Sequence, residues 1–153
     1  MQNNLNDKAE ILMETLPFMR RYSNKVIVIK FGGHAMGKKE YVKTFAQDVS
    51  LLQQVGILPI VVHGGGPQIG EMLKKLKIES NFIDGLRVTD AATIDVVEMV
   101  LCGIINKSIV SAISNEGANA VGISGKDGNL ISAKRLSVIC LLYTSDAADD
   151  RVS

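Results

Sequence analysis

The sequence has little of several features that mark specialised classes of protein. It has two cysteines and two histidines in 153 residues, and no tryptophan. Cys102 and Cys140 stand far apart and outside any CxxC spacing, which excludes a disulfide framework and a structural zinc site. We therefore predict free thiols in a reducing compartment and no bound metal. So few histidines also leave a Ser-His-Asp triad poorly supported.

An excess of charge of either sign is also missing. The 17 basic and 16 acidic residues nearly cancel, which argues against a nucleic-acid partner. Weak basic clusters, such as the one at Lys74, Lys75 and Lys77, are interpreted as solvated helix faces. The N-terminus has no apolar signal region, and no apolar run approaches the length of a membrane span. We expect a cytoplasmic protein without a membrane partner.

Apolar spacing predicts alternating strands and helices. Residues 5–22 have helical spacing, with Pro17 expected to kink or split the helix. The strand "KVIVIK" (25–30), a helix over 38–55 and the strand "ILPIVV" (57–62) form a βαβ unit, which favours a parallel sheet. Gly56 is expected just past the end of that helix.

The second half of the chain continues the pattern. We predict a helix from Pro67 to Lys77, a turn at Asp84-Gly85, and a long helix from an N-cap at Thr89 or Asp90 to Asn115 that Gly103 interrupts. The segments "NAVGIS" (119–124) and "LISAKRL" (130–136) are predicted strands. The fold class is α/β, a three-layer αβα sandwich with a mainly parallel central sheet.

Two glycine-rich turns follow the first two strands, in "VIVIKFGG" and "PIVVHGGGPQI". Ligands of open parallel sheets bind at the carboxyl ends of the strands, where both turns are expected to lie. Gly64, Gly65 and Gly66 lead directly into a helix N-terminus, where backbone N–H groups and the helix dipole favour an anion. The glycines would let an anionic ligand rest on bare backbone.

Glycine alone leaves several interpretations open. The P-loop pattern G-x-x-x-x-G-K-[ST] is absent. A Rossmann-like dinucleotide-binding module remains an alternative, because Gly64, Gly66 and Gly70 give the fingerprint with one extra spacer, and Asp84 follows at the distance of the ribose-binding acid. "HGGG" is also typical of the oxyanion loop of esterases, but the G-x-S-x-G elbow fails at its last glycine.

A longer series of motifs is more specific. "IKFGGHAM", "VVHGGGPQI", "GLRVTD", "INKSIV" and "AVGISGKDGNLISA" follow one another between residues 25 and 138. This series closely resembles the amino acid kinase family and, within it, the acetylglutamate kinases. The resemblance implies transfer of the γ-phosphoryl group of MgATP to the side-chain carboxylate of N-acetyl-L-glutamate, which yields an acyl phosphate in arginine biosynthesis. Positioning and charge neutralisation would carry such a reaction.

The resemblance also implies residue roles. Lys30 matches the catalytic lysine that binds the transferring phosphoryl group, where its ammonium would offset developing charge. Gly32 and Gly33 match glycines that donate N–H groups to the nucleotide phosphates. Without the resemblance, Lys30 would be interpreted as a strand-end lysine that reaches water.

The substrate that accepts the phosphoryl group has its own set of matching residues. Gly65 and Gly66 match the pair that holds the amino-acid substrate through backbone contacts. Arg87 matches the arginine that binds the substrate α-carboxylate, a role that suits a planar guanidinium. On spacing alone, a surface arginine is the competing interpretation.

The expected organisation has three parts. Residues 1–24 form a helix that resembles the oligomerisation extension of arginine-inhibited relatives, which implies a homo-oligomer (dimer or hexamer) and L-arginine as an inhibitor. Residues 25–138 form the acetylglutamate-binding lobe, and residues 139–153 are interpreted as a non-native tail. Family members are about twice this length, and most of their ATP site lies in the half not matched here. The isolated chain is therefore expected to be an inactive fragment.

Overall fold

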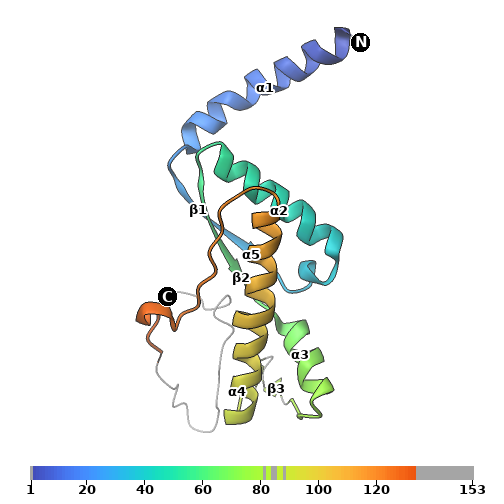
Figure 1. Cartoon of the computed structure of the whole chain (residues 1–153), viewed down its shortest axis with the longest axis vertical. Helices are drawn as coiled ribbons and strands as arrows, with labels where there is room; N and C mark the ends of the chain where they lie inside the picture. The colour runs from blue at the N-terminus through green and yellow to red at the C-terminus, as the bar shows by residue number, and fades with distance from the viewer. Residues whose placement is uncertain (1, 81, 84–85, 88, 134–153) are drawn as a thin grey trace.

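The computed structural model describes residues 2–80, 82–83, 86–87 and 89–133. The first half contains α1 (Gln2–Tyr22), β1 (Val26–Phe31), the short helix η1 (Ala35–Gly37), α2 (Lys39–Gln54), β2 (Leu58–His63) and α3 (Gly66–Lys75). The second half contains β3 (Phe82–Ile83), β4 (Leu86–Arg87), α4 (Ala91–Glu98), η2 (Met99–Ile105), α5 (Asn106–Asn115) and η3 (Asp127–Asn129). Figure 1 shows their arrangement.

The predicted βαβ unit is confirmed. β1 and β2 pair in parallel, in register from Val26 opposite Leu58 to Phe31 opposite His63. Gly56 follows α2 with φ of 85°, a left-handed conformation that glycine adopts without strain, so the predicted helix end is also confirmed. The β-branched runs form strands because their stiff side chains pack well on a pleated surface.

Helices cover one face of this sheet. α2 and α5 pack together beneath it, and the buried residues of α2, α3, α4, η2 and α5 form one core with Phe31. The ring of Phe31 stacks on that of Phe45 with centroids 3.9 Å apart, which holds the end of β1 against α2. The periodicity predicted for these helices thus reflects their burial on the same core.

The opposite face of the sheet is bare in the described part of the chain. Val26 and Val28 of β1 are 60% and 64% exposed, and Leu58 and Ile60 of β2 are 51% and 50% exposed. The α/β class and the parallel sheet are confirmed, and the described residues build two of the three layers. Contiguous apolar surface of this kind promotes association between molecules.

The long helix begins at Ala91 and is capped by Asp90, whose Oδ1 accepts a hydrogen bond from the backbone N–H of Thr93 at 2.7 Å. Its middle, η2, has π-helical hydrogen bonding and contains Gly103, so the predicted interruption is confirmed. Such a segment is rare inside an α-helix and occurs often at functional sites.

One helical stretch is long and apolar enough to cross a membrane by those two criteria alone. It is Ala91–Asn115, with a mean hydropathy of 1.8. The expectation that no apolar run approaches that length was therefore wrong. The reason is that this helix supplies core residues of the domain, among them Val100, Ile105 and Ile109, and a core helix needs as many apolar residues as a spanning one.

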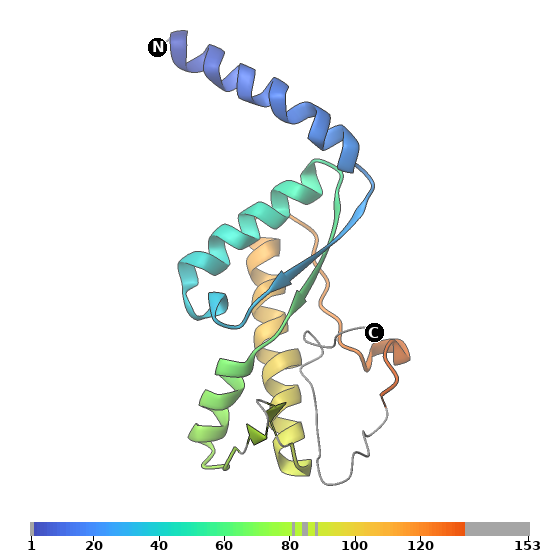
Figure 2. The same ribbon diagram turned by 180° about the vertical axis from the view of Figure 1, so that it is seen from behind.

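α1 extends away from the rest of the molecule, with the N-terminus at its far end (Figures 1 and 2). It runs through Pro17 as one element and is not split there. Its apolar side chains are largely exposed, with Leu5, Leu12 and Phe18 each above 60%. Within the described chain, α1 therefore has an unburied apolar surface.

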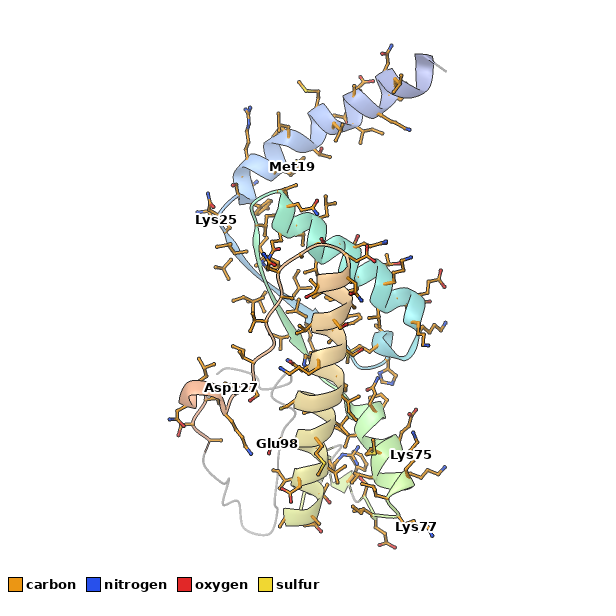
Figure 3. All side chains as sticks on the ribbon, in the orientation of Figure 1. Met19, Lys25, Lys75, Lys77, Glu98 and Asp127 are labelled. Carbon is orange, nitrogen blue, oxygen red and sulfur yellow. The ribbon has the colours of Figure 1, made fainter. Side chains whose placement is uncertain are left out.

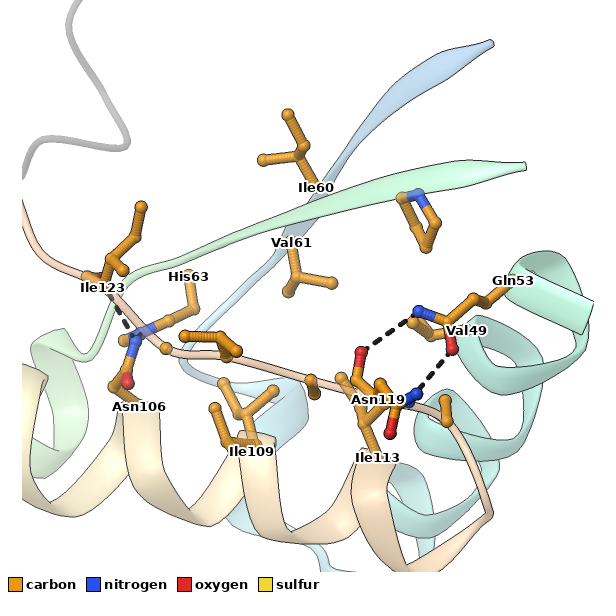
Figure 4. A pocket seen from close by; sticks show the side chains of 16 residues that line it. Val49, Gln53, Ile60, Val61, His63, Asn106, Ile109, Ile113, Asn119 and Ile123 are labelled. Carbon is orange, nitrogen blue, oxygen red and sulfur yellow. Dashed lines mark hydrogen bonds between the residues drawn. The ribbon is translucent and has the colours of Figure 1, made fainter. Parts of the chain in front are cut away.

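The predicted strand at residues 119–124 does not form. Its backbone groups bond to helix side chains instead of to β2: Asn119 exchanges two hydrogen bonds with the Gln53 carboxamide, at 3.0 and 3.1 Å, and Gly122 O accepts from Lys107 Nζ at 3.0 Å. Figure 4 shows this segment beside β2. A cavity of about 300 Å³ lies between the segment, β2 and α5. Residues 130–133 are not in a strand either, and 134–136 lie outside the described residues.

Two smaller predictions have different outcomes. α3 begins one residue before Pro67 and ends at Lys75, within two residues of the predicted end. The turn predicted at Asp84-Gly85 lies outside the described residues, although β3 and β4 pair antiparallel on either side of it. Lys75 and Lys77 are exposed at the end of α3, as expected for a solvated basic face (Figure 3).

Candidate functional site

The two glycine turns lie in contact at the carboxyl edge of the sheet. The carboxamide Nε2 of Gln68 donates a hydrogen bond to Gly33 O at 2.9 Å. A Cβ atom added to Gly33 would lie 3.0 Å from Pro67 Cδ and 3.5 Å from Gly65 Cα. Figure 2 shows both strands ending beside the start of α3. The parallel pairing of β1 and β2 thus brings together the loops that the sequence placed at their ends.

Each turn contains one open glycine and one packed glycine, and the second turn also contains the buried Gly64. A Cβ added to Gly32 or to Gly66 would meet no heavy atom of the described residues within 4 Å, and both residues are exposed. At Gly33 and at Gly65, other atoms of the protein lie close to the position that a Cβ atom would take. The open glycines leave backbone accessible to a ligand, whereas the packed ones allow the two turns to approach.

Gly65 is buried beneath the π-helical segment. A Cβ at Gly65 would overlap Ile105 Cδ1 and would lie 2.8 Å from Leu101 Cδ2. No motif in the sequence marks these two residues as part of the site. They are ordinary apolar residues of the long helix, four positions apart and therefore on one face of it.

Arg87 brings a positive charge to the second turn. Its Nη2 donates to Gly66 O at 3.5 Å, its Nη1 donates to Ser80 Oγ, and its guanidinium carbon lies 4.6 Å from the centroid of the Phe82 ring. Partial burial lowers the pKa of Arg87, but a guanidinium remains charged at any physiological pH. Arg87 is partly buried, and these contacts hold its guanidinium against the second turn.

Lys30 is the fifth residue of β1, opposite Val62 in the register, and comes two positions before Gly32. Its side chain is exposed. Side chains alternate along a strand, so Lys30 lies on the same face of the sheet as Val26 and Val28. The structure thus places Lys30 at the carboxyl edge of the sheet. The adjoining turns hold the other predicted site residues, which are Gly32, Gly33, Gly65, Gly66 and Arg87.

The second turn has a polar neighbour on its other side. His63 Nδ1 lies 3.2 Å from Gly64 O, and Asn106 Nδ2 lies 3.5 Å from His63 Nε2. Asn106 Nδ2 also donates to Ile123 O at 3.4 Å (Figure 4). These contacts connect the end of β2 to the first turn of α5 and give His63 a structural role.

The loop around η3 is joined to the long helix by an ion pair between Lys126 Nζ and Glu98 Oε2. The hydrogen bond to Glu98 raises the pKa of Lys126, and hydrogen bonds from Ser124 lower the pKa of Asp127. All of these groups are at the surface, so the pair adds little to stability. Within the described ranges, no group of three His, Cys, Asp or Glu side chains could hold a metal ion.

An open parallel sheet with two joined glycine turns and a guanidinium at its carboxyl edge is a framework for binding anionic groups. The sequence model of the amino acid kinase family matches residues 25–152, so the chain belongs to the amino acid kinase family.

Similar proteins make the comparison more specific. The chain is 66% identical over 129 residues to an acetylglutamate kinase of Rhodospirillum rubrum, covering 84% of this chain and 42% of that protein. It is 60% identical over 130 residues to an acetylglutamate kinase of Saccharophagus degradans, covering 85% of this chain and 43% of that protein. The chain thus spans less than half the length of the curated relatives that it matches.

Solved structures agree at the level of the fold. N-acetylglutamate synthase from Neisseria gonorrhoeae, complexed with coenzyme A and N-acetyl-glutamate, matches with a TM-score of 0.60 at 21% identity, over 72% of this chain and 26% of that one. The smu.665 protein from Streptococcus mutans UA159 matches with a TM-score of 0.55 at 28% identity, over 61% of this chain and 37% of that one.

Proposed function

We propose that this chain forms the N-acetyl-L-glutamate-binding and phosphoryl-facing part of an acetylglutamate kinase. The single observation that carries the proposal is the contact of the Arg87 guanidinium with Gly66 at the N-terminus of α3. The high identity to acetylglutamate kinases supports it. The dinucleotide-binding alternative is disfavoured, because the chain belongs to the amino acid kinase family. In addition, a Cβ at Gly70 would meet only Arg87 Nη2 within 4 Å, at an ordinary contact distance of 3.8 Å, so the close packing that the third glycine of that fingerprint provides is not needed there.

In this proposal the anionic acceptor lies on the second turn. Its α-carboxylate binds Arg87, and the backbone N–H groups of Gly65 and Gly66 at the start of α3 hold its polar groups. The side-chain carboxylate is then the nucleophile, and because it is already ionised, it needs no general base. The work of the site is to bring two negatively charged groups together in line.

The phosphoryl donor, ATP, would approach the first turn. The open backbone at Gly32, the N–H groups of the turn and the ammonium of Lys30 would bind the transferring phosphoryl group and neutralise its charge. Mg²⁺ would arrive with the nucleotide. Among the described residues, no group of three His, Cys, Asp or Glu side chains could hold this ion without the nucleotide. We also propose a cytoplasmic location, which fits such a biosynthetic reaction.

The test is calorimetric binding of N-acetyl-L-glutamate to the 153-residue chain. Arg87→Ala should weaken binding on the order of tenfold to a hundredfold, because a charged hydrogen bond to the ligand is lost. The matched ligand is the α-amide of N-acetylglutamate, which lacks the carboxylate that Arg87 would bind. Arg87→Ala should change the affinity of the amide much less. Equal losses for both ligands, or no binding by the unchanged chain, would refute the proposal.

The exposed apolar surface of α1 supports a further part of the proposal, that α1 packs against α1 of a second copy in an oligomer that L-arginine inhibits. Leu12→Glu should then lower the mass measured by sedimentation, whereas Glu14→Lys, on the opposite face of α1, should leave it unchanged. A monomer at all concentrations with the unchanged chain would rule this assembly out.

A further inference from the structure

We infer that Gln68 is a positioning residue that sets the distance and orientation of the two glycine turns relative to one another. The inference rests on the proposed function for its consequence, which is correct alignment of the two anionic reactants. Its structural basis stands apart from that function, in contacts among described residues.

The carboxamide of Gln68 lies between the turns. Nε2 donates to Gly33 O at 2.9 Å across 35 positions of sequence. Oε1 would lie 3.3 Å from a Cβ added to Gly33 and 3.9 Å from one added to Gly65. Gln68 is in the first turn of α3, directly after the second glycine turn. Its side chain therefore attaches the first turn to the helix that begins at the second.

The other end of the carboxamide supports a role beyond stability. Gln68 Oε1 is buried and has no hydrogen-bond partner among the described residues. A buried unsatisfied acceptor costs free energy that an apolar side chain of the same shape would not cost. A residue that only filled this space would be better apolar. The polar group is explained by what its N–H does, which is to hold the Gly33 carbonyl.

Holding that carbonyl has a consequence for an anion. The C=O and N–H of a planar trans peptide point in opposite directions. When Gln68 holds Gly33 O toward α3, the N–H of His34 points away from α3, and the partial negative charge of the carbonyl stays on the α3 side. Without Gln68, this peptide could rotate and present its carbonyl oxygen to a phosphoryl group. Gln68 thus keeps a repulsive dipole away from the path of the phosphate.

The test compares three variants of the 153-residue chain. Gln68→Met keeps the shape and removes the donor. Gln68→Glu removes the donor at neutral pH and regains one when its carboxyl group is protonated. Gln53→Met is the matched control, because Gln53 also connects two distant backbone segments, α2 and Asn119, but lies away from the turns.

The first readout is binding of MgATP and, separately, of N-acetyl-L-glutamate by calorimetry, with folding checked by urea unfolding. We expect Gln68→Met to weaken MgATP binding about tenfold and N-acetyl-L-glutamate binding much less, because the Gly33 carbonyl lies in the turn that faces the phosphate, and we expect Gln53→Met to leave both unchanged. In Gln68→Glu, MgATP affinity relative to the unchanged chain should recover as the pH falls and the O–H donor forms. Should Gln68→Met fail to fold, this recovery within one folded variant decides the question. Unchanged MgATP affinity in Gln68→Met, or no recovery in Gln68→Glu, would overturn the inference.

A second readout separates this inference from the proposed function. In NMR spectra, scalar coupling across the hydrogen bond should connect Gln68 Nε2 to the Gly33 carbonyl carbon, and Gln68→Met should shift the amide signals of Gly32 to His34. If the unchanged chain does not bind N-acetyl-L-glutamate, the proposed function fails. The scalar coupling and the amide shifts still test whether Gln68 positions the first turn. Absence of both would refute its positioning role whatever the ligand.

Discussion

The two glycine turns follow similar strands but are held in different ways. The turn after β2 is anchored in the hydrophobic core, with Gly65 under the methyl groups of Leu101 and Ile105. The turn after β1 rests on its neighbour through the ring of Pro67 and one hydrogen bond from Gln68. One turn is therefore part of the fold, and the other is attached to it. A methyl group added to the core-anchored turn after β2 should lower the stability of the fold. A methyl group added to the turn after β1 should instead disturb the alignment of the two turns.

The largest effect is expected at the core-anchored turn. Gly65→Ala should lower the free energy of unfolding by about 1–3 kcal/mol, because two core side chains must leave their positions. Urea unfolding measures the change. Gly66→Ala is the control, since the described residues leave open space there and Gly66 is helical. Equal stability of the two variants would contradict the anchoring of this turn.

A smaller loss of stability is expected at the attached turn. Gly33→Ala should lower the free energy of unfolding by at most about 1 kcal/mol, toward the lower end of overpacking costs, because the turn can move away from Pro67. The free energy of MgATP binding, measured by calorimetry, should weaken by more than the free energy of unfolding falls, because this turn faces the phosphate. In a double-mutant cycle, Gly33→Ala and Gln68→Met should be non-additive, since both break the same contact. Additive effects would show that the two residues act separately.

The smallest effect tests the helix that anchors the second turn. Hydrogen bonds from the Thr93 side chain and then its backbone N–H lower the pKa of Asp90 below its ordinary value of 3.8. A lowered folded-state pKa adds stability that is complete above the unfolded value and is lost as the pH falls through the folded value. Asp90→Asn keeps a capping side chain and should remove this dependence.

The measurement for Asp90 is urea unfolding between neutral pH and pH about 3, on the acidic side of the ordinary carboxylate range. The unchanged chain should lose stability relative to Asp90→Asn over the acidic part of that range. Parallel curves for the two proteins would show that the cap carboxylate does not contribute through its charge.

Local patterns predicted the elements that depend on local chemistry. The βαβ unit, the left-handed Gly56 and the Asp90 cap follow from apolar periodicity and from the conformations that single residues prefer. The strand at residues 119–124 was predicted on the same grounds and does not form. Strand pairing needs a partner backbone. Here the backbone groups of this segment are bound instead by the side chains of Asn106, Lys107 and Gln53. Side-chain competition of this kind is not visible in the β-propensity of a segment.

The candidate site likewise combines features that are local in the sequence with features that depend on distant contacts. By itself, the amino-acid sequence determined that bare backbone follows two neighbouring strands and that a lysine and an arginine are available near it, because glycine turns and strand ends are local features. Only the tertiary structure decided which glycines are open, that Arg87 reaches Gly66 and that Gln68 connects the turns. Those facts depend on contacts between residues far apart in the chain, and the packing of β1, β2 and the long helix creates them.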